Sequence, residues 1–170
     1  MWRNWGSDIV LSPKMERKFK IAGTWIWSVE TASKIHLLMT LEEERPIRYS
    51  SIAGMLCLSR ARSVMNCYRV DYVRTKPSIR GSGIVTRLYR RLAEDGMVVM
   101  SGSSQSKHSQ RLWKRLCMSK NSSVYVMDSA GSIRKARIRG DVVTDGKIGV
   151  HDGSEKSVML LSKRRPKRAK

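Results

Sequence analysis

The sequence has few acidic residues: 14 Asp and Glu stand against 34 Lys and Arg, which gives a net charge of +20. A charge of this sign and size predicts an anionic partner, with nucleic acid as the first candidate and an acidic protein surface as the second. Long apolar runs are also missing, and the polar start Trp2-Arg3-Asn4-Trp5 is unlike a secretory signal. We therefore expect a cytoplasmic protein without a membrane partner.

Cysteine and histidine are scarce, with three residues of each type. The cysteines lie in apolar surroundings without the CxxC spacing of a zinc or redox site, and the histidines are scattered. We expect reduced core thiols and no metal site. The residues concerned are Cys57, Cys67, Cys117, His36, His108 and His151.

The length of 170 residues fits one domain with its own core. We predict a single domain over residues 1–162, made of an N-terminal part (1–65), a central part (66–118) and a C-terminal part (119–162). Residues 163–170 hold six cations in eight positions and predict a mobile basic tail. The sequence leaves the oligomeric state open.

The N-terminal part mixes helical and strand patterns. Ser12-Pro13 is a good helix start, and the apolar positions that follow predict a short amphipathic helix that ends before Gly23. Residues 24–30 and 49–59 favour strands, whereas residues 33–44 fit either a helix or a buried strand. The acidic triplet that begins at Glu42 is read as a solvated turn.

The central part contains a strand, a glycine loop and a helix in direct succession. Tyr68 to Tyr72 alternates as a strand, Arg80-Gly81-Ser82-Gly83 forms the loop, and Ile84, Leu88 and Leu92 share one helical face. The first amides of a helix lack internal partners, and glycines let a ligand approach the backbone. The joint is therefore suited to a phosphate, although an ordinary tight turn remains an alternative.

The order of elements after this joint predicts an α/β (α+β) fold with a mixed central sheet. Residues 97–100 read as a buried parallel strand and residues 108–118 as a second helix. Short apolar runs separated by turn signals predict an antiparallel β-meander in the C-terminal part. These strand candidates are residues 124–127, 133–138, 142–143, 148–150 and 158–161.

The loop Arg80-Gly81-Ser82-Gly83-Ile84-Val85 and the later run Leu112-Trp113-Lys114-Arg115-Leu116 resemble motifs of the GNAT superfamily of acyl-CoA-dependent N-acyltransferases. The spacing between the two motifs is also similar to that of the family. Among its members, the chain looks most like the small proteins of bacteriophages, including the Mom-like DNA-modifying branch. This resemblance implies a GNAT-like fold, and for a phage protein the cytoplasm would be that of the host.

The resemblance implies acetyl-CoA or another acyl-CoA as cofactor, with its pyrophosphate on the glycine loop. The backbone near Val73 would polarise the thioester carbonyl. The sequence departs from the family pattern at Val85, at Ser106 and at Trp113, which replaces a tyrosine acid with an indole that cannot protonate a thiolate. The implied cofactor contacts are Val73, Arg80, Gly81, Ser82, Gly83, Ile84, Val85 and Ser106.

Two residues are candidates for proton transfer if the chain is an enzyme. Asp71, the one carboxylate on the strand before the loop, is the candidate base. Tyr125 is a candidate acid, with a core position as the alternative.

The residues that we expect to bind nucleic acid are basic side chains of the two helices, one hairpin and the tail. They are Arg87, Arg90, Arg91, Lys107, Arg111, Lys114, Arg134, Lys135, Arg164, Arg165, Lys167 and Arg168. Three functions remain open: an acyltransferase that acts on or binds nucleic acid, an inactive GNAT-like protein that binds nucleic acid or inhibits a host protein, and a structural virion or ribonucleoprotein component.

Overall fold

The computed structural model describes residues 16–43, 49–102, 105–119, 123–139, 142–144 and 157–169. The chain divides into two compact units. The first comprises Met1–Leu58 with Tyr72–Ile84, and the second comprises Ser59–Asp71 with Val85–Lys170. Two neighbouring strands, β4 (Ile52–Ala61) and β5 (Cys67–Thr75), continue from one unit into the other.

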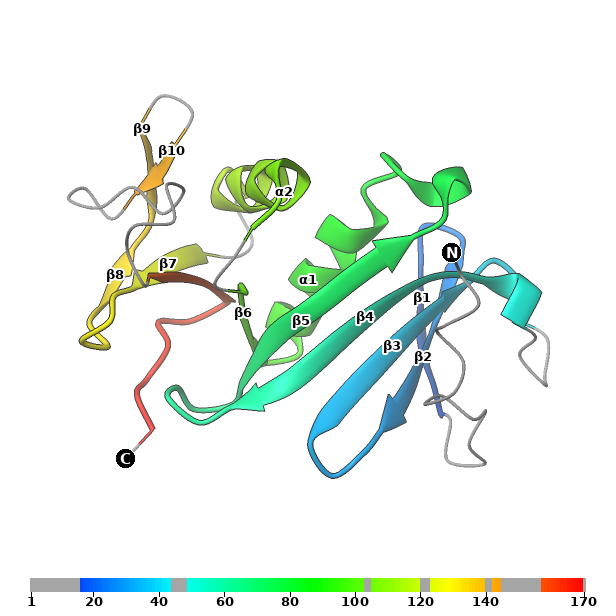
Figure 1. Ribbon diagram of the computed structural model, residues 1–170, viewed down its shortest axis with the longest axis horizontal. Helices are drawn as coiled ribbons and strands as arrows, with labels where there is room; N and C mark the ends of the chain where they lie inside the picture. Colours follow the sequence, from blue (N-terminus) through cyan, green and yellow to red (C-terminus); the bar gives the residue numbers. More distant parts are fainter. Residues whose placement is uncertain are drawn as a thin grey trace. The chain divides into compact units, whose positions relative to one another are not determined.

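Within the described residues, hydrogen bonds order the strands of the main sheet as β1-β2-β3-β4-β5-β6-β11-β7-β8 (Figure 1). Strands β5 and β6 are parallel, whereas the pairs β1–β2, β2–β3, β6–β11, β11–β7 and β7–β8 are antiparallel. The predicted mixed α/β fold is therefore confirmed. The strands not yet placed are β1 (Glu16–Ile21), β2 (Thr24–Glu30), β3 (Lys34–Thr40), β6 (Val98–Met100), β7 (Ser123–Met127), β8 (Ile133–Lys135) and β11 (Val158–Ser162).

The first unit opens with a hairpin, and the helix predicted up to Ala22 is wrong over its described part. Residues Glu16–Ile21 form β1, which pairs with β2 through a two-residue turn. Ala22 and Gly23 both have positive φ, 47° and 79°, as a turn that follows the twist of a hairpin requires. Pairing with β2 outweighs the helical spacing of the apolar residues. Residues 12–15 lie outside the described part of the chain.

Strands β2 and β3 pair along their whole length, so the ambiguous segment 33–44 contains a strand. Trp27 is almost fully buried, and its indole Nε1 donates to Thr40 Oγ1 at 2.9 Å. Leu38, Ile52 and Met55 complete the core cluster around this tryptophan. The hydrogen bond matters because a buried indole N–H without an acceptor costs free energy.

The second unit contains both helices, α1 (Ile84–Glu94) and α2 (Lys107–Cys117), apart from the first residue of α1. The predictions of a helix after the loop, a buried strand and a second helix are confirmed. Strand β6 is fully buried and pairs in parallel with Cys67–Arg69 of β5. Helix α1 buries Leu88 and Leu92, as its spacing predicts.

The C-terminal strands are antiparallel, as expected, but they do not follow one another across the sheet. β11 returns between β6 and β7, and β8 ends the order. The predicted strand 133–138 is divided: Ile133–Lys135 belongs to the main sheet, while β9 (Arg137–Arg139) pairs with β10 (Val142–Thr144) in a separate two-stranded sheet. The predicted strand 148–150 lies outside the described residues.

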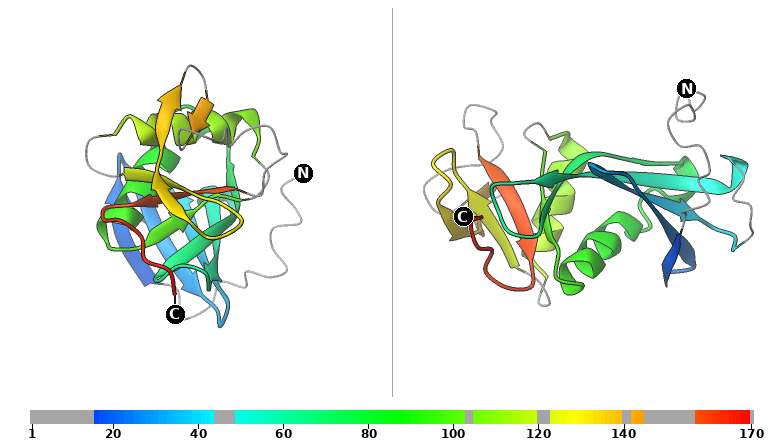
Figure 2. Two further views of the ribbon diagram at one scale, coloured as in Figure 1. Left: turned by 90° about the vertical axis from the view of Figure 1, so that its left-hand side faces the viewer. Right: turned by 90° about the horizontal axis from the view of Figure 1, so that it is seen from below.

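The basic C-terminal segment differs from the expected mobile tail. Met65 N donates to Lys167 O at 2.9 Å, and Ala169 N donates to Ser63 O at 3.2 Å. Figures 1 and 2 show this segment, in red, running beside the loop between β4 and β5. We call Lys163–Ala169 the docked tail. Its charge alone predicted mobility, whereas backbone pairing with a distant turn holds it in place.

Candidate functional site

The glycine loop, defined as Arg80–Gly83, connects β5 to α1 in the first unit. A 3-10 turn, η3 (Pro77–Ile79), follows β5, and Arg80 N donates to Pro77 O at 3.1 Å. Gly81 and Gly83 both have φ of 78°, a conformation that side chains disfavour. Ser82 lies between them, and its hydroxyl donates to Ile79 O at 2.7 Å. The two glycines are therefore needed for the shape of this loop.

The electrostatics of the glycine loop favour an anion. No acidic residue lies in the first turn of α1, and within the described residues no acceptor is assigned to the amides of Gly81, Gly83 and Val85. The amide of Ile84 has a long bond, 3.4 Å, to Ser82 Oγ. Unpartnered amides at the positive end of a helix dipole suit a phosphate group.

There is space beside the two glycines. A Cβ atom built on Gly81 or Gly83 would meet no heavy atom within 4 Å. The glycines therefore leave the backbone open on the side where a side chain would stand. A phosphate or pyrophosphate group fits both the donors and the space of this loop.

Arg80 is partly engaged by its own loop. Its Nε donates to Thr75 O at 3.1 Å, which folds the side chain back toward the end of β5. Arg80 is exposed, and its terminal guanidinium nitrogens remain available to an anion. Of the other implied cofactor contacts in the first unit, Ile84 is buried at the helix start, and Val73 is 37% exposed on β5.

The loop depends on a close approach of β4 to β5. A Cβ on Gly54 would lie 3.0 Å from Arg74 O and 3.0 Å from Met39 Sδ. Next to this contact, Lys76 N donates to Ala53 O at 2.7 Å. Gly54 therefore sets the position of the strand end that carries the loop, and its role had no signal in the sequence beyond a glycine inside a strand.

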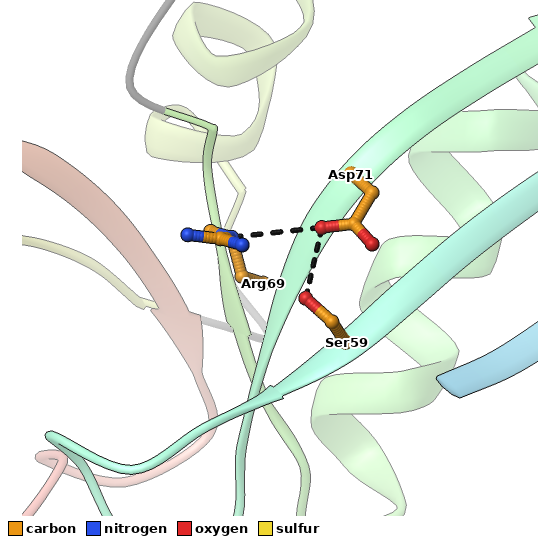
Figure 3. Close-up of polar contacts among 3 residues, drawn as sticks. All are labelled: Ser59, Arg69 and Asp71. Atoms are coloured by element: carbon orange, nitrogen blue, oxygen red, sulfur yellow. Dashed lines mark hydrogen bonds and ion pairs between the residues drawn. The ribbon is translucent and has the colours of Figure 1, made fainter. Parts of the chain in front are cut away.

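Asp71, the predicted base, belongs to the second unit and is already engaged. Ser59 Oγ donates to Asp71 Oδ1 at 2.8 Å, and Arg69 Nε lies 3.5 Å from the same oxygen (Figure 3). The side chain of Asp71 is 19% exposed. Sequence reasoning did not find Ser59, which lies on β4 and is brought to Asp71 only by strand pairing. The hydrogen bond from Ser59 and the ion pair with Arg69 restrain the orientation of the carboxylate.

The structure does not bring Tyr125 and Asp71 together. Arg69 of β5 pairs with Met100, Met100 pairs with Leu160, and Leu160 pairs with Tyr125. Three strand spacings, about 14 Å, therefore separate the strand of Asp71 from that of Tyr125. Tyr125 is half-buried and packs against a core cluster, so its position is that of a core residue.

Ser106 and Trp113 have structural roles on α2. Ser106 caps the helix, since its Oγ accepts from Ser109 N at 3.3 Å. Trp113 is 1% exposed and packs edge-on against Tyr89, with ring centroids 6.0 Å apart. Burial raises the pKa of the Tyr89 hydroxyl, which makes it a poor proton donor at neutral pH. Neither aromatic residue therefore supplies the acid missing from the sequence motif.

The basic residues of α1 differ in exposure. Arg87 is exposed, and Arg91 forms an ion pair with Asp95 at 3.1 Å. Arg90 is half-buried, because it flanks the buried stripe that includes Tyr89 and Ala93. Only part of this expected nucleic-acid contact therefore faces solvent.

On the other elements, most of the predicted nucleic-acid contacts are exposed. Lys114, on α2, is half-buried. Val85, which is an implied cofactor contact, is also half-buried, in the first turn of α1. The exposed residues are Lys107, Arg111, Arg134, Lys135, Arg164, Arg165, Lys167 and Arg168.

Cys57 and Cys67 are buried core thiols, as expected, whereas Cys117 is only half-buried. Burial raises the pKa of Cys67 to about 12 and that of Cys117 to about 11. Among the described residues, no group of three or more His, Cys, Asp or Glu side chains is placed to hold a metal ion. Neither of the described helices is long and apolar enough to cross a membrane.

Comparison with known proteins gave matches to solved structures alone. No family model matches the sequence, and no curated protein is significantly similar to it.

The matching solved structures include the following three acetyltransferases. An IAA acetyltransferase from Bacillus cereus is 14% identical, with a TM-score of 0.40 over 76% of this chain and 77% of that one. The ribosomal-protein-S18-alanine N-acetyltransferase of Escherichia coli is 10% identical, with a TM-score of 0.39 over 78% of this chain and 70% of that one. A Bacillus subtilis acetyltransferase in complex with CoA is 13% identical, with a TM-score of 0.38 over 76% of each chain. Scores this low carry no conclusion about family or activity.

Proposed function

We propose that this protein binds acyl-CoA in the manner of the GNAT superfamily and is an N-acyltransferase that acts on nucleic acid, or on a protein bound to it. The observation that carries the proposal is the glycine loop. Gly81 and Gly83 have positive φ and open space beside them, and the amides around them precede a helix whose first turn has no acidic residue. These features suit a pyrophosphate.

Within this proposal, the amides of Gly81, Gly83 and Val85 hold the pyrophosphate and the Arg80 guanidinium adds a positive charge. Bound acyl-CoA supplies an activated acyl group for transfer to an amine. Val73 lies on β5 beyond the stretch, Cys67–Arg69, that pairs with β6. Its backbone is our candidate for the contact to the acyl carbonyl.

The acceptor half of the proposal rests on charge. The net charge of +20 is larger than solubility requires, and exposed cations lie on α1, α2, β8 and the docked tail. A nucleic acid supplies the opposite charge at high density. Acceptor amines then lie either on the nucleic acid or on a protein bound to it.

A second candidate is a nucleic-acid-binding protein of the same architecture without catalysis. Two observations favour it: Trp113 is buried where the family resemblance asks for an acid, and Asp71 already pairs with Arg69 and accepts from Ser59. Both candidates keep the charged surface. They differ in whether an acyl group is transferred.

Calorimetry of the purified chain with acetyl-CoA and with CoA tests the pyrophosphate site. We expect binding that Arg80→Ala weakens and Gly83→Trp abolishes, since an indole would fill the space beside the loop. Gly96→Trp is the matched control, because Gly96 also has positive φ and open space but ends the same helix. An absence of binding at about 1 mM ligand would overturn the proposal.

The two candidates are separated by a transfer assay with radiolabelled acetyl-CoA. Duplex DNA, RNA and a basic peptide serve as acceptors, and the label is measured on the acceptor after the protein is removed. Transfer that requires Asp71, measured against Asp71→Asn, supports the enzyme. Acetyl-CoA binding without transfer to any acceptor favours the second candidate.

A further inference from the structure

The docked tail is held to the second unit by its backbone as well as by its side chains. An isolated antiparallel bridge joins Val64 to Arg168, flanked by the hydrogen bonds to Ser63 and Met65 described above. Pro166 is buried, although every other described residue of the docked tail is exposed. The segment therefore follows a defined path beside the turn between β4 and β5 (Figure 2).

Two arginines of the docked tail contact the β7–β8 hairpin. Arg165 Nη2 donates to Ile133 O at 3.3 Å. The Arg168 guanidinium packs against Gly131, where an added Cβ would lie 2.5 Å from Nη2. Gly131 also has φ of 79°, so both backbone conformation and space call for glycine there. These contacts hold two cations close to the hairpin instead of releasing them to solvent.

The docking gathers further cations from three distant parts of the sequence. The end of β4 contributes Arg60, and the turn after it contributes Arg62. Strand β8 contributes Lys135, and the docked tail contributes Lys163, Arg164 and Lys167. All six are exposed, and none has an ion pair within the described residues. The nearby carboxylate of Asp128 accepts from Ser132 N at 2.8 Å and closes its own turn.

Like charges that are held together without carboxylates destabilise the folded chain. A free tail would avoid this cost by moving away from the other cations. The chain instead uses backbone hydrogen bonds and a buried proline to keep the charges in place. A partner with closely spaced negative charges reverses the sign of the effect, because each phosphate it brings neutralises a fixed cation.

We propose that the docked tail, the β4–β5 turn and β8 form a fixed surface for the phosphate backbone of nucleic acid. The inference rests on the nucleic-acid part of the proposed function and gives it a location. Binding is independent of base sequence, because the surface offers Lys and Arg charges to phosphates. A fixed tail also avoids the entropy that a disordered segment loses when it binds.

The first test measures fluorescence anisotropy of a labelled short duplex DNA, and of RNA of the same sequence, with the full chain at several salt concentrations. The variant Arg164→Gln/Lys167→Gln removes two charges from the surface. The matched control Lys20→Gln/Lys34→Gln removes two exposed charges from β1 and β3, which have no part in the proposed surface. We expect the tail variant to lose about tenfold or more in affinity and about one unit of salt slope per charge.

The control variant is expected to change affinity by less than about threefold under the same conditions. Equal losses in the two variants would overturn the proposal, because net charge would then explain binding without a located surface. No binding of the native chain to DNA or RNA, with binding to polyglutamate instead, would also overturn it in favour of an acidic protein partner. Acetyl-CoA calorimetry on the same samples shows whether the pyrophosphate proposal stands independently.

A second test separates a fixed tail from a merely basic one. Gly131→Ala places a Cβ against the Arg168 guanidinium, and Pro166→Gly removes the buried anchor, so both loosen the docked tail without changing charge. Circular dichroism and thermal melting confirm that each variant is folded. We expect both to lower nucleic-acid affinity severalfold with an unchanged salt slope. Native affinity in the folded Pro166→Gly variant would show that docking has no part in binding.

Discussion

The chain carries two anion-facing regions that are built on different principles. The glycine loop uses backbone amides, and the side chain of its one arginine, Arg80, donates to the backbone carbonyl of Thr75. The docked tail uses side-chain charge, while its backbone accepts from Met65 N and donates to Ser63 O. Amides in a fixed loop select the shape of one phosphate group, whereas spread cations select charge density.

This difference separates what each region can recognise. The positive φ angles of Gly81 and Gly83 define the backbone shape of the loop. A defined backbone shape suits a small ligand that always presents the same pyrophosphate. The docked tail offers no such set of loop amides, and its exposed cations suit a long polyanion in any register. Under the two proposals, the molecule combines a site for a small ligand with a surface for a large one.

Salt gives the largest expected contrast between the two regions. The affinity for duplex DNA should fall by about 10³ between 50 and 200 mM salt if about six phosphates are contacted. The affinity for acetyl-CoA should change by less than about threefold, because amides and one arginine release few counterions. Titrations of both ligands across one salt series measure this, and parallel slopes would show that both ligands bind through net charge.

Gly54→Ala is expected to damage the glycine loop and to spare the docked tail. The added methyl group meets Arg74 O and Met39 Sδ at 3.0 Å, so the end of β5 must shift or the fold must lose about 1–3 kcal/mol. We expect a lower melting temperature and weaker acetyl-CoA binding with native DNA affinity. Gly23→Ala, at a position with positive φ and open space, is the control for a loss of stability that arises from backbone strain without a steric clash. Acetyl-CoA binding at native strength in Gly54→Ala would contradict this role.

The sequence predicted the glycine loop and its flanking elements because their signals are local. The glycines, the Pro77 turn and the spacing of Ile84, Leu88 and Leu92 all lie within a short stretch, and each appears as predicted. The partners of Asp71 were not predicted. Ser59 lies twelve residues away on another strand, and strand register decides that the two side chains meet.

The docked tail and the N-terminal hairpin were missed for the same physical reason. A run of cations predicts solvation, and nothing near Lys167 in the sequence points to Met65, about a hundred residues earlier. Likewise, the segment before Ala22 has helical spacing, and only its pairing with β2 shows it to be a strand. In both segments, backbone pairing with a distant part of the chain determines the structure, and composition does not reveal such pairing.

Arg80→Lys tests whether the arginine of the glycine loop acts through geometry or through charge. Lysine keeps the charge but loses the bond from Nε to Thr75 O and the forked donor pattern. We expect about a tenfold loss in acetyl-CoA affinity, the size of one hydrogen bond that involves a charged group. Calorimetry beside Lys76→Arg, a neighbouring charge-conserving change, measures this. Full affinity in Arg80→Lys would assign the arginine a purely electrostatic role.

Cys67 reports whether the docked tail covers the core beside it. Cys67 belongs to the cluster that contains Val64, the residue that bridges to the tail at Arg168. Burial raises its pKa from 9.0 to about 12, so at pH 8 the folded chain holds much less thiolate than an exposed thiol would, and labelling should be slow. Because the unfolded thiol ionises first, this group makes stability fall as pH rises from 9 toward 12.

Deletion of residues 163–170 removes the bridge at Val64 and should speed the labelling of Cys67 severalfold at pH 8, by raising the frequency of local opening. Cys117, on α2 with a pKa of about 11, is the internal control and should label at an unchanged rate. Mass spectrometry of the labelled peptides resolves the two thiols. Equal acceleration of labelling at both thiols would indicate a general loss of stability. No acceleration at either thiol would show that the docked tail adds charge without protecting the core around Cys67 from local opening.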